Sequence, residues 1–130
     1  MSIPGADGVV LAGVAGQGGD RYAADTDDLI KILADSGIAL RYQDDGVHDR
    51  LLLKSADWWG PVVLFTQQAL ADGLGTLLAN AVWELIVKRP KTHIHLDVGC
   101  FRNDHTEVTW FKGDGSANDV LEALRVWRGD

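Results

Sequence analysis

The feature that most constrains this chain is a strict alternation of apolar and polar residues in its last third. In residues 92–98, Ile94, Leu96 and Val98 alternate with polar side chains. Successive side chains of a strand point to opposite faces, so this pattern predicts a strand with one buried and one polar face. The alternation therefore requires a sheet that is covered on one side by other parts of the chain.

The remaining segments supply strands and helices that can form and cover such a sheet. Strands are predicted over residues 8–15, 38–43 and 106–112, and residues 50–54 are predicted to return from a turn at Asp45-Gly46 as a hairpin partner. Helices are predicted between Thr26 and Gly37, within the apolar region Trp58 to Val87, and from the capping residue Ser116 to Trp127.

Capping signals mark the ends of the first and last helices. Thr26 is the predicted N-cap of the first helix, and Gly37 suits the left-handed position after its end. Gly113-Asp114-Gly115 predicts a turn into the last helix. Ser116, followed three residues later by Asp119, is typical of a helix N-terminus.

The middle helix is predicted from the longest apolar region. Pro61 fits its first turn and Pro90 its end. Asp72-Gly73 and Gly75 are predicted to break or kink it, giving two helices or one bent helix.

The order of these elements, β-α-β-(β)-α-β-β-α, predicts the fold class. It indicates an α+β two-layer sandwich, ferredoxin-like or related, with about three helices on a mixed sheet of four or five strands. The chain has 130 residues, and residues 1–130 are predicted to form a single domain.

Charge and cysteine content exclude several classes of protein. The chain has 12 Lys and Arg against 19 Asp and Glu, a net charge of −7, which disfavours nucleic acid as a partner. A single cysteine excludes an internal disulfide and a cysteine-rich zinc site. With no targeting signal at its start, the chain is expected to be cytoplasmic.

The polar side of residues 92–98 is the sharpest candidate for chemistry. His93, His95 and Asp97 share one face, where two imidazoles and a carboxylate could bind a metal ion and serve a small metal-dependent hydrolase. The pattern partly resembles the HxHxDH motif of the metallo-β-lactamase superfamily, with Val98 in place of the last histidine. The favoured interpretation is the polar outer face of a two-layer sheet, with no metal.

Other catalytic and cofactor motifs are incomplete. The glycine run from Gly13 to Gly19 lacks both the lysine of a phosphate loop and the spacing of a dinucleotide site, which favours a surface loop. Cys100 with His105 could form a nucleophilic pair, but a structural thiol is favoured. We therefore expect no catalytic residue, no cofactor and no enzymatic activity.

The region 58–88 has aromatic residues at one end and basic residues at the other, as a membrane span does. Its charged residues and its short uncharged run disfavour insertion and favour a central helix with surplus apolar surface, which would form a subunit or partner interface. Trp110 and Trp127 have core-like spacing, whereas Trp58 and Trp59 have no obvious structural role. We therefore predict that Trp58 and Trp59 contact a protein partner or a second copy of the chain.

The order of elements also resembles a family of small effector-associated constant components of bacterial conflict systems. The similarity lies in residues 74–85 (LGTLLANAVWEL), Lys88-Arg89 and the strand–turn–helix from Val108 to Leu124. The insert around Asp45 and the glycine loop depart from it. The resemblance implies a non-enzymatic adaptor or sensor and transfers no catalytic residue.

A second binding hypothesis follows from the acidic stretches Asp25 to Asp28 and Asp44 to Asp49. A small acidic protein can neutralise a toxin by covering its basic surface, because complementary charge accelerates association. An immunity protein is therefore the alternative to the adaptor.

Overall fold

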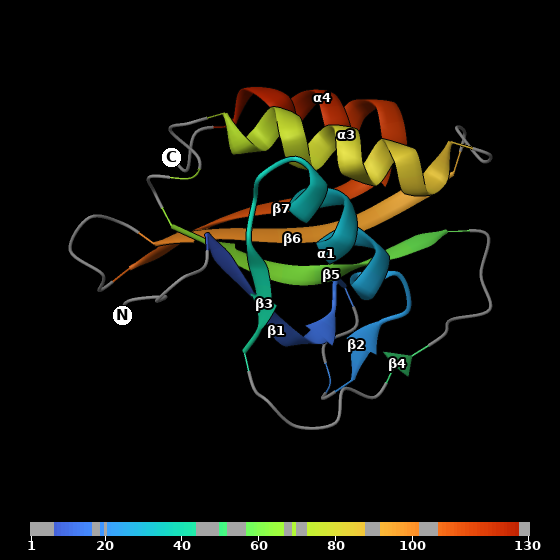
Figure 1. Ribbon diagram of the computed structural model, residues 1–130. Coiled ribbons are helices and arrows are strands. Elements are labelled where there is room, and N and C mark those ends of the chain that lie inside the picture. Colours follow the sequence, from blue (N-terminus) through green and yellow to red (C-terminus); the bar gives the residue numbers. More distant parts are fainter. Residues whose placement is uncertain are drawn as a thin grey trace.

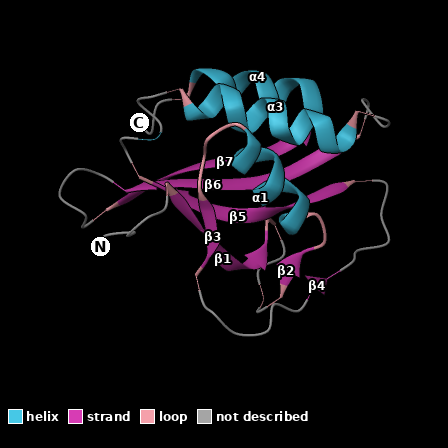
Figure 2. Cartoon of the chain, in the orientation of Figure 1, coloured by secondary structure: helices cyan, strands magenta, loops and turns pink. Residues whose placement is uncertain are grey.

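The computed structural model describes residues 7–16, 19, 21–43, 50–51, 57–66, 69, 73–87, 92–101 and 107–127. Within these residues, a mixed sheet is covered on one face by helices (Figures 1 and 2). The strands are β1 (Gly8–Val14), β2 (Tyr22–Ala23), β3 (Leu40–Tyr42), β4 (Arg50–Leu51), β5 (Trp58–Phe65), β6 (His93–Phe101) and β7 (Val108–Ser116). The helices are α1 (Thr26–Asp35), α3 (Leu74–Ile86) and α4 (Ala117–Val126). The predicted α+β architecture is confirmed.

The sheet has both parallel and antiparallel pairs. Strand β1 is antiparallel to β5, β5 is parallel to β6, and β6 is antiparallel to β7. On its other side β1 pairs in parallel with β3 at one end and with β2 at the other. The two-residue strands β2 and β4 extend the sheet beyond the four or five predicted strands.

The first part of the apolar middle region is a strand rather than a helix. Residues 58–65 form β5 between β1 and β6, and Pro61 lies where both neighbouring ladders shift register. A proline cannot donate to a ladder, and a bulge is one of the places where a sheet accepts it. The prediction of a helix starting at Pro61 is therefore wrong. The helix α3 begins only after Gly73, and Gly75 lies inside it.

The predicted hairpin is also wrong. Arg50–Leu51 pairs in parallel with Tyr22–Ala23, not with the strand at residues 40–42. The turn at Asp45-Gly46 lies outside the described residues. Alternation shows that a segment can form a strand, but it does not select the neighbouring strand.

The ends of the helices follow the capping predictions in part. Ser116 caps α4, with its Oγ accepting a hydrogen bond from Asp119 N at 3.3 Å. Gly37 follows α1 with a φ of +88°, as predicted. Thr26 is not the N-cap. It is the first residue of α1, and its hydroxyl donates to the carbonyl oxygen of Ala23 at 2.7 Å.

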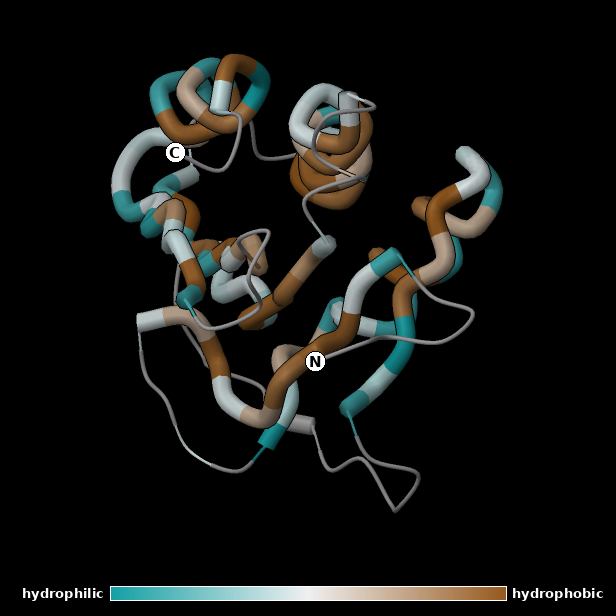
Figure 3. The backbone as a smooth tube through the Cα atoms, turned by 90° about the vertical axis from the view of Figure 1, so that its left-hand side faces the viewer, coloured by the Kyte–Doolittle hydropathy of each residue, from teal (hydrophilic) through white to brown (hydrophobic). Residues whose placement is uncertain are grey.

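The core lies between the sheet and the helices, as Figure 3 shows from the side. The inward residues predicted for the alternating strand, Ile94, Leu96 and Val98, are fully buried there. They belong to the same buried core cluster as apolar residues of α3, among them Leu78 and Val82. The outward residues of β6 are left on the opposite side of the sheet.

Strand β7 is longer than predicted. It continues through Gly113, Asp114 and Gly115 to Ser116, where a turn was predicted. Its residues pair one-to-one with β6 along its whole length. This extension places Asp114 on the sheet, directly opposite His95.

Candidate functional site

The outward row of β6 has three polar residues in different environments. His93 is exposed and Asp97 is partly buried, whereas the His95 side chain is only 14% exposed. These three residues alternate with the buried Ile94 and Leu96, which confirms the prediction that they share one face of the strand. Burial singles out His95 as the centre of a local cluster.

The imidazole of His95 lies between two carboxylates. Its Nε2 is 2.9 Å from Asp57 Oδ2, and its Nδ1 is 2.9 Å from Asp114 Oδ1. An ionised carboxylate only accepts hydrogen bonds, so both contacts are made as hydrogen bonds when both ring nitrogens carry protons. In this geometry neither nitrogen faces an open position for a metal ion or a nucleophile.

One face of the same imidazole is covered by an indole. The rings of Trp59 and His95 are stacked, with centroids 3.8 Å apart and planes 9° apart. The turn after β1 lies over them, since a Cβ on Gly16 would be 3.3 Å from Trp59 Cζ3. Trp59 Nε1 is buried and has no hydrogen-bond partner among the described residues.

The strand registers explain how these residues meet. The parallel β5–β6 pair places Trp59 beside His95, and the antiparallel β6–β7 pair places Asp114 on the other side. Asp57 immediately precedes β5. We call Asp57, Trp59, His95 and Asp114 the histidine cluster.

The cluster differs from the predicted metal set. The predicted metal ligands are His93, His95 and Asp97. In the structure, the ring nitrogens of His95 contact Asp57 and Asp114 instead. In the part of the chain that the structure describes, no group of three or more His, Cys, Asp or Glu residues is placed to hold a metal ion. His48 and His105 lie outside that part.

The sequence predicts neither Asp57 nor Asp114 as a member of this cluster. Its pattern places Asp114 in a turn. Extending the alternation of Trp110 and Lys112 by two residues would have placed it on the same face of β7. Asp57 lies before a segment predicted as helical, and no sequence signal relates it to His95.

Trp58 and Trp59, the predicted contact pair, are successive residues of β5, so their side chains point to opposite faces of the sheet. Trp58 is only 3% exposed, and its Nε1 donates to Asp25 Oδ2 at 2.8 Å. It therefore lies in the core on the helix side, which corrects the expectation that both rings would be available to a partner. Trp59 faces the opposite side of the sheet, within the histidine cluster.

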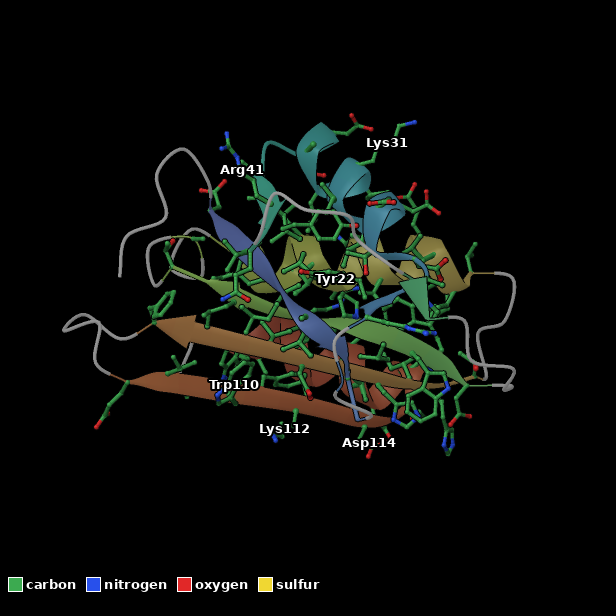
Figure 4. All side chains as sticks on the ribbon, turned by 90° about the horizontal axis from the view of Figure 1, so that it is seen from below. Tyr22, Lys31, Arg41, Trp110, Lys112 and Asp114 are labelled. Carbon is green, nitrogen blue, oxygen red and sulfur yellow. The ribbon has the colours of Figure 1, made fainter. Side chains whose placement is uncertain are left out.

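The sheet face opposite the helices carries a row of three apolar side chains and one glycine across four strands, in which Leu64 is only 6% exposed. Trp110 lies beside Gly99, and the strand pairing continues the row to Leu64 and Val9. Trp110 is 40% exposed, which corrects its predicted place in the core. Figure 4 looks onto this side of the sheet and labels Trp110 on β7.

The next row on this side includes charged residues. Lys112, Asp97, Val62 and Leu11 follow one another across the same four strands. We call these two rows together the uncovered face, because every described helix lies on the other side of the sheet.

The remaining candidates are Cys100 and the two acidic stretches, and the described ones lie in the core or form hydrogen bonds within the chain. Cys100 lies in the core on β6, and not in a loop as predicted. Of the first acidic stretch, Asp25 accepts from Trp58, and Asp27 accepts from the hydroxyl of Tyr42. The second stretch, residues 44–49, lies outside the described residues.

The region 58–88 contributes a strand and a helix. Among the described residues, none of the helices has the length and apolar character needed to cross a membrane.

Comparisons with protein families, with curated proteins and with solved structures find no match for this chain.

Proposed function

We propose that the protein is a non-enzymatic binding component that contacts a protein partner through the uncovered face. The exposed indole of Trp110, next to the apolar row of the sheet, carries this proposal. Exposed tryptophans with apolar neighbours are enriched among the residues that dominate binding energy. The contact is therefore expected to centre on Trp110.

The surroundings of Trp110 support a binding role. A Cβ on Gly99 would lie 3.0 Å from Trp110 Cζ3, so the indole lies against the backbone of β6 rather than projecting freely. An indole held in this way loses little conformational entropy when it is buried by a partner. Lys112 and Asp97 in the next row provide charges that can select the partner.

The resemblance to effector-associated constant components supports the same role. That family implies an adaptor or sensor in a bacterial conflict system, which acts by binding and needs no catalytic residue. We therefore propose a protein of such a system as the partner.

The experiment compares two variants of the tagged chain in affinity capture from cells that encode it. Trp110→Asp places a charge in the uncovered face, whereas Val126→Asp places the same charge on α4, where Val126 is 74% exposed. We expect Trp110→Asp to abolish capture of the partner and Val126→Asp to retain it, with circular dichroism showing that both variants are folded. Capture that survives Trp110→Asp would contradict the proposal.

A further inference from the structure

Strand β7 forms an edge of the sheet. Its nine residues pair with β6, and no other strand pairs with it among the described residues (Figure 4). An edge strand of this length presents a row of backbone donors and acceptors that can pair with another strand. The side chains of β7 indicate which strand can pair with it.

The two halves of this strand are opposite in character. Before Gly113 stand Trp110, Phe111 and Lys112, which are bulky or basic. After it come Asp114, Gly115 and Ser116, which are small or acidic. If β7 of one copy pairs in antiparallel orientation with β7 of a second copy, the bulky or basic half of each strand lies opposite the small or acidic half of the other.

We propose that a second copy of this chain pairs with β7 in antiparallel orientation, with Gly113 on the two-fold axis. The two sheets then become one continuous sheet, with the helices of both copies on the same side. This inference goes beyond the proposed function, because it does not depend on what binds the uncovered face.

Charge favours this register over the two adjacent ones. A two-fold axis at Lys112 would place two lysines opposite each other, and an axis at Asp114 would place two aspartates opposite each other. Like charges in directly opposite positions destabilise a strand pair. With the axis at Gly113, Lys112 of each copy faces the partner's Asp114, which gives two opposite-charge pairs.

The geometry around these residues fits the same register. Asp114 is held by His95 through one carboxylate oxygen, yet its side chain remains 76% exposed and can also accept from a lysine. On the helix side, Phe111 falls opposite the partner's Gly115, where an aromatic side chain can cover a glycine.

Contact with α4 of the same chain explains the glycine at the proposed axis. A Cβ at this position would lie 2.5 Å from Val120 Cγ1, so α4 leaves no room for a side chain on that side of the strand.

The first test measures mass by sedimentation equilibrium over a concentration series that reaches the millimolar range. We expect the wild type to form a dimer. Lys112→Asp and Asp114→Lys should each weaken dimerisation roughly tenfold, since each turns two attractive pairs into repulsive ones. An equimolar mixture of the two variants should restore it, because only the mixed dimer has opposite charges in every pair. A wild type that stays monomeric throughout overturns the proposal, and so does a mixture no tighter than the separate variants.

A second test fixes the register with a short thiol-reactive cross-linker. Lys112→Cys mixed with Asp114→Cys should give more covalent dimer than either variant alone, because only the mixture places two thiols directly opposite each other. The buried Cys100 of the wild type provides the background. Cross-linking of Lys112→Cys with itself that is as efficient as in the mixture, or none in the mixture, overturns the proposed axis. A complex of β7 with a strand of another protein gives no cross-linked homodimer and overturns it as well.

Discussion

Trp59 lies flat on His95, with the two ring centroids 3.8 Å apart. Each nitrogen of the same imidazole faces a carboxylate oxygen at 2.9 Å. The side chain of His95 thus connects the start of β5 to the end of β7. We therefore expect His95 to hold together β5 and β7, two of the four strands that form the uncovered face.

The first prediction concerns this connection. His95→Ala removes the donor to Asp57 and the ring against Trp59, and should lower the free energy of unfolding by about 1–3 kcal/mol. The exposed contact with Asp114 should contribute little of this. Urea denaturation measures the change.

His93→Ala is the matched control for this prediction. His93 lies two residues away on the same face of β6, but it is exposed. Its replacement should change stability by less than about 0.5 kcal/mol. Equal losses for the two variants would contradict a specific role of His95.

The second prediction concerns the packing of α3 on α4. Alanine in place of glycine within a helix normally stabilises it by about 1 kcal/mol. A Cβ at Gly75, however, would lie 2.6 Å from the carbonyl oxygen of Leu124, which is backbone and cannot rotate away. Gly75→Ala should therefore lower the thermal midpoint, because it forces the two helices apart.

Thr76→Ala is the control in the same turn of α3. Thr76 is exposed, so its replacement should leave the midpoint unchanged or raise it slightly. A higher midpoint for Gly75→Ala would show that α4 does not approach α3 as closely at Gly75 as the structure indicates.

The third prediction concerns the buried tryptophan. Asp25→Ala leaves the indole N–H of Trp58 without its acceptor and should cost about 1–3 kcal/mol of unfolding free energy. Asp28→Ala changes an exposed charge in the first turn of α1, and should cost only about 0.3–1 kcal/mol. Chemical denaturation of the two variants measures both changes in unfolding free energy. A larger decrease for Asp28→Ala than for Asp25→Ala would contradict a stabilising role of the hydrogen bond between Trp58 and Asp25.

The sequence predicts the amphipathic elements of this fold and fails where a segment is apolar on both sides. Strand β6 and helix α4 follow from their periodicity, since each buries one face. Strand β5 is apolar almost throughout because it lies in the middle of the sheet, and such a run does not distinguish a strand from a helix. Pro61 then suggested a helix start, although in the folded chain it lies at a bulge.

The histidine cluster could be predicted only in part, for a related reason. The common face of His93 and His95 follows from alternation within one strand. The contacts of His95 with Asp57 and Asp114 depend on how three strands pair, and pairing register is a property of the assembled sheet. The exposure of Trp110 likewise depends on which face of the sheet the helices cover.

Hydroxyl-radical footprinting of the purified complex reports directly whether a protein partner covers the uncovered face, as we propose. Trp110 and the half-buried Trp83 of α3 provide one probe on each side of the molecule. We expect oxidation of Trp110 to slow in the complex and oxidation of Trp83 to stay unchanged. Unchanged oxidation of Trp110 together with protection of Trp83 would contradict it.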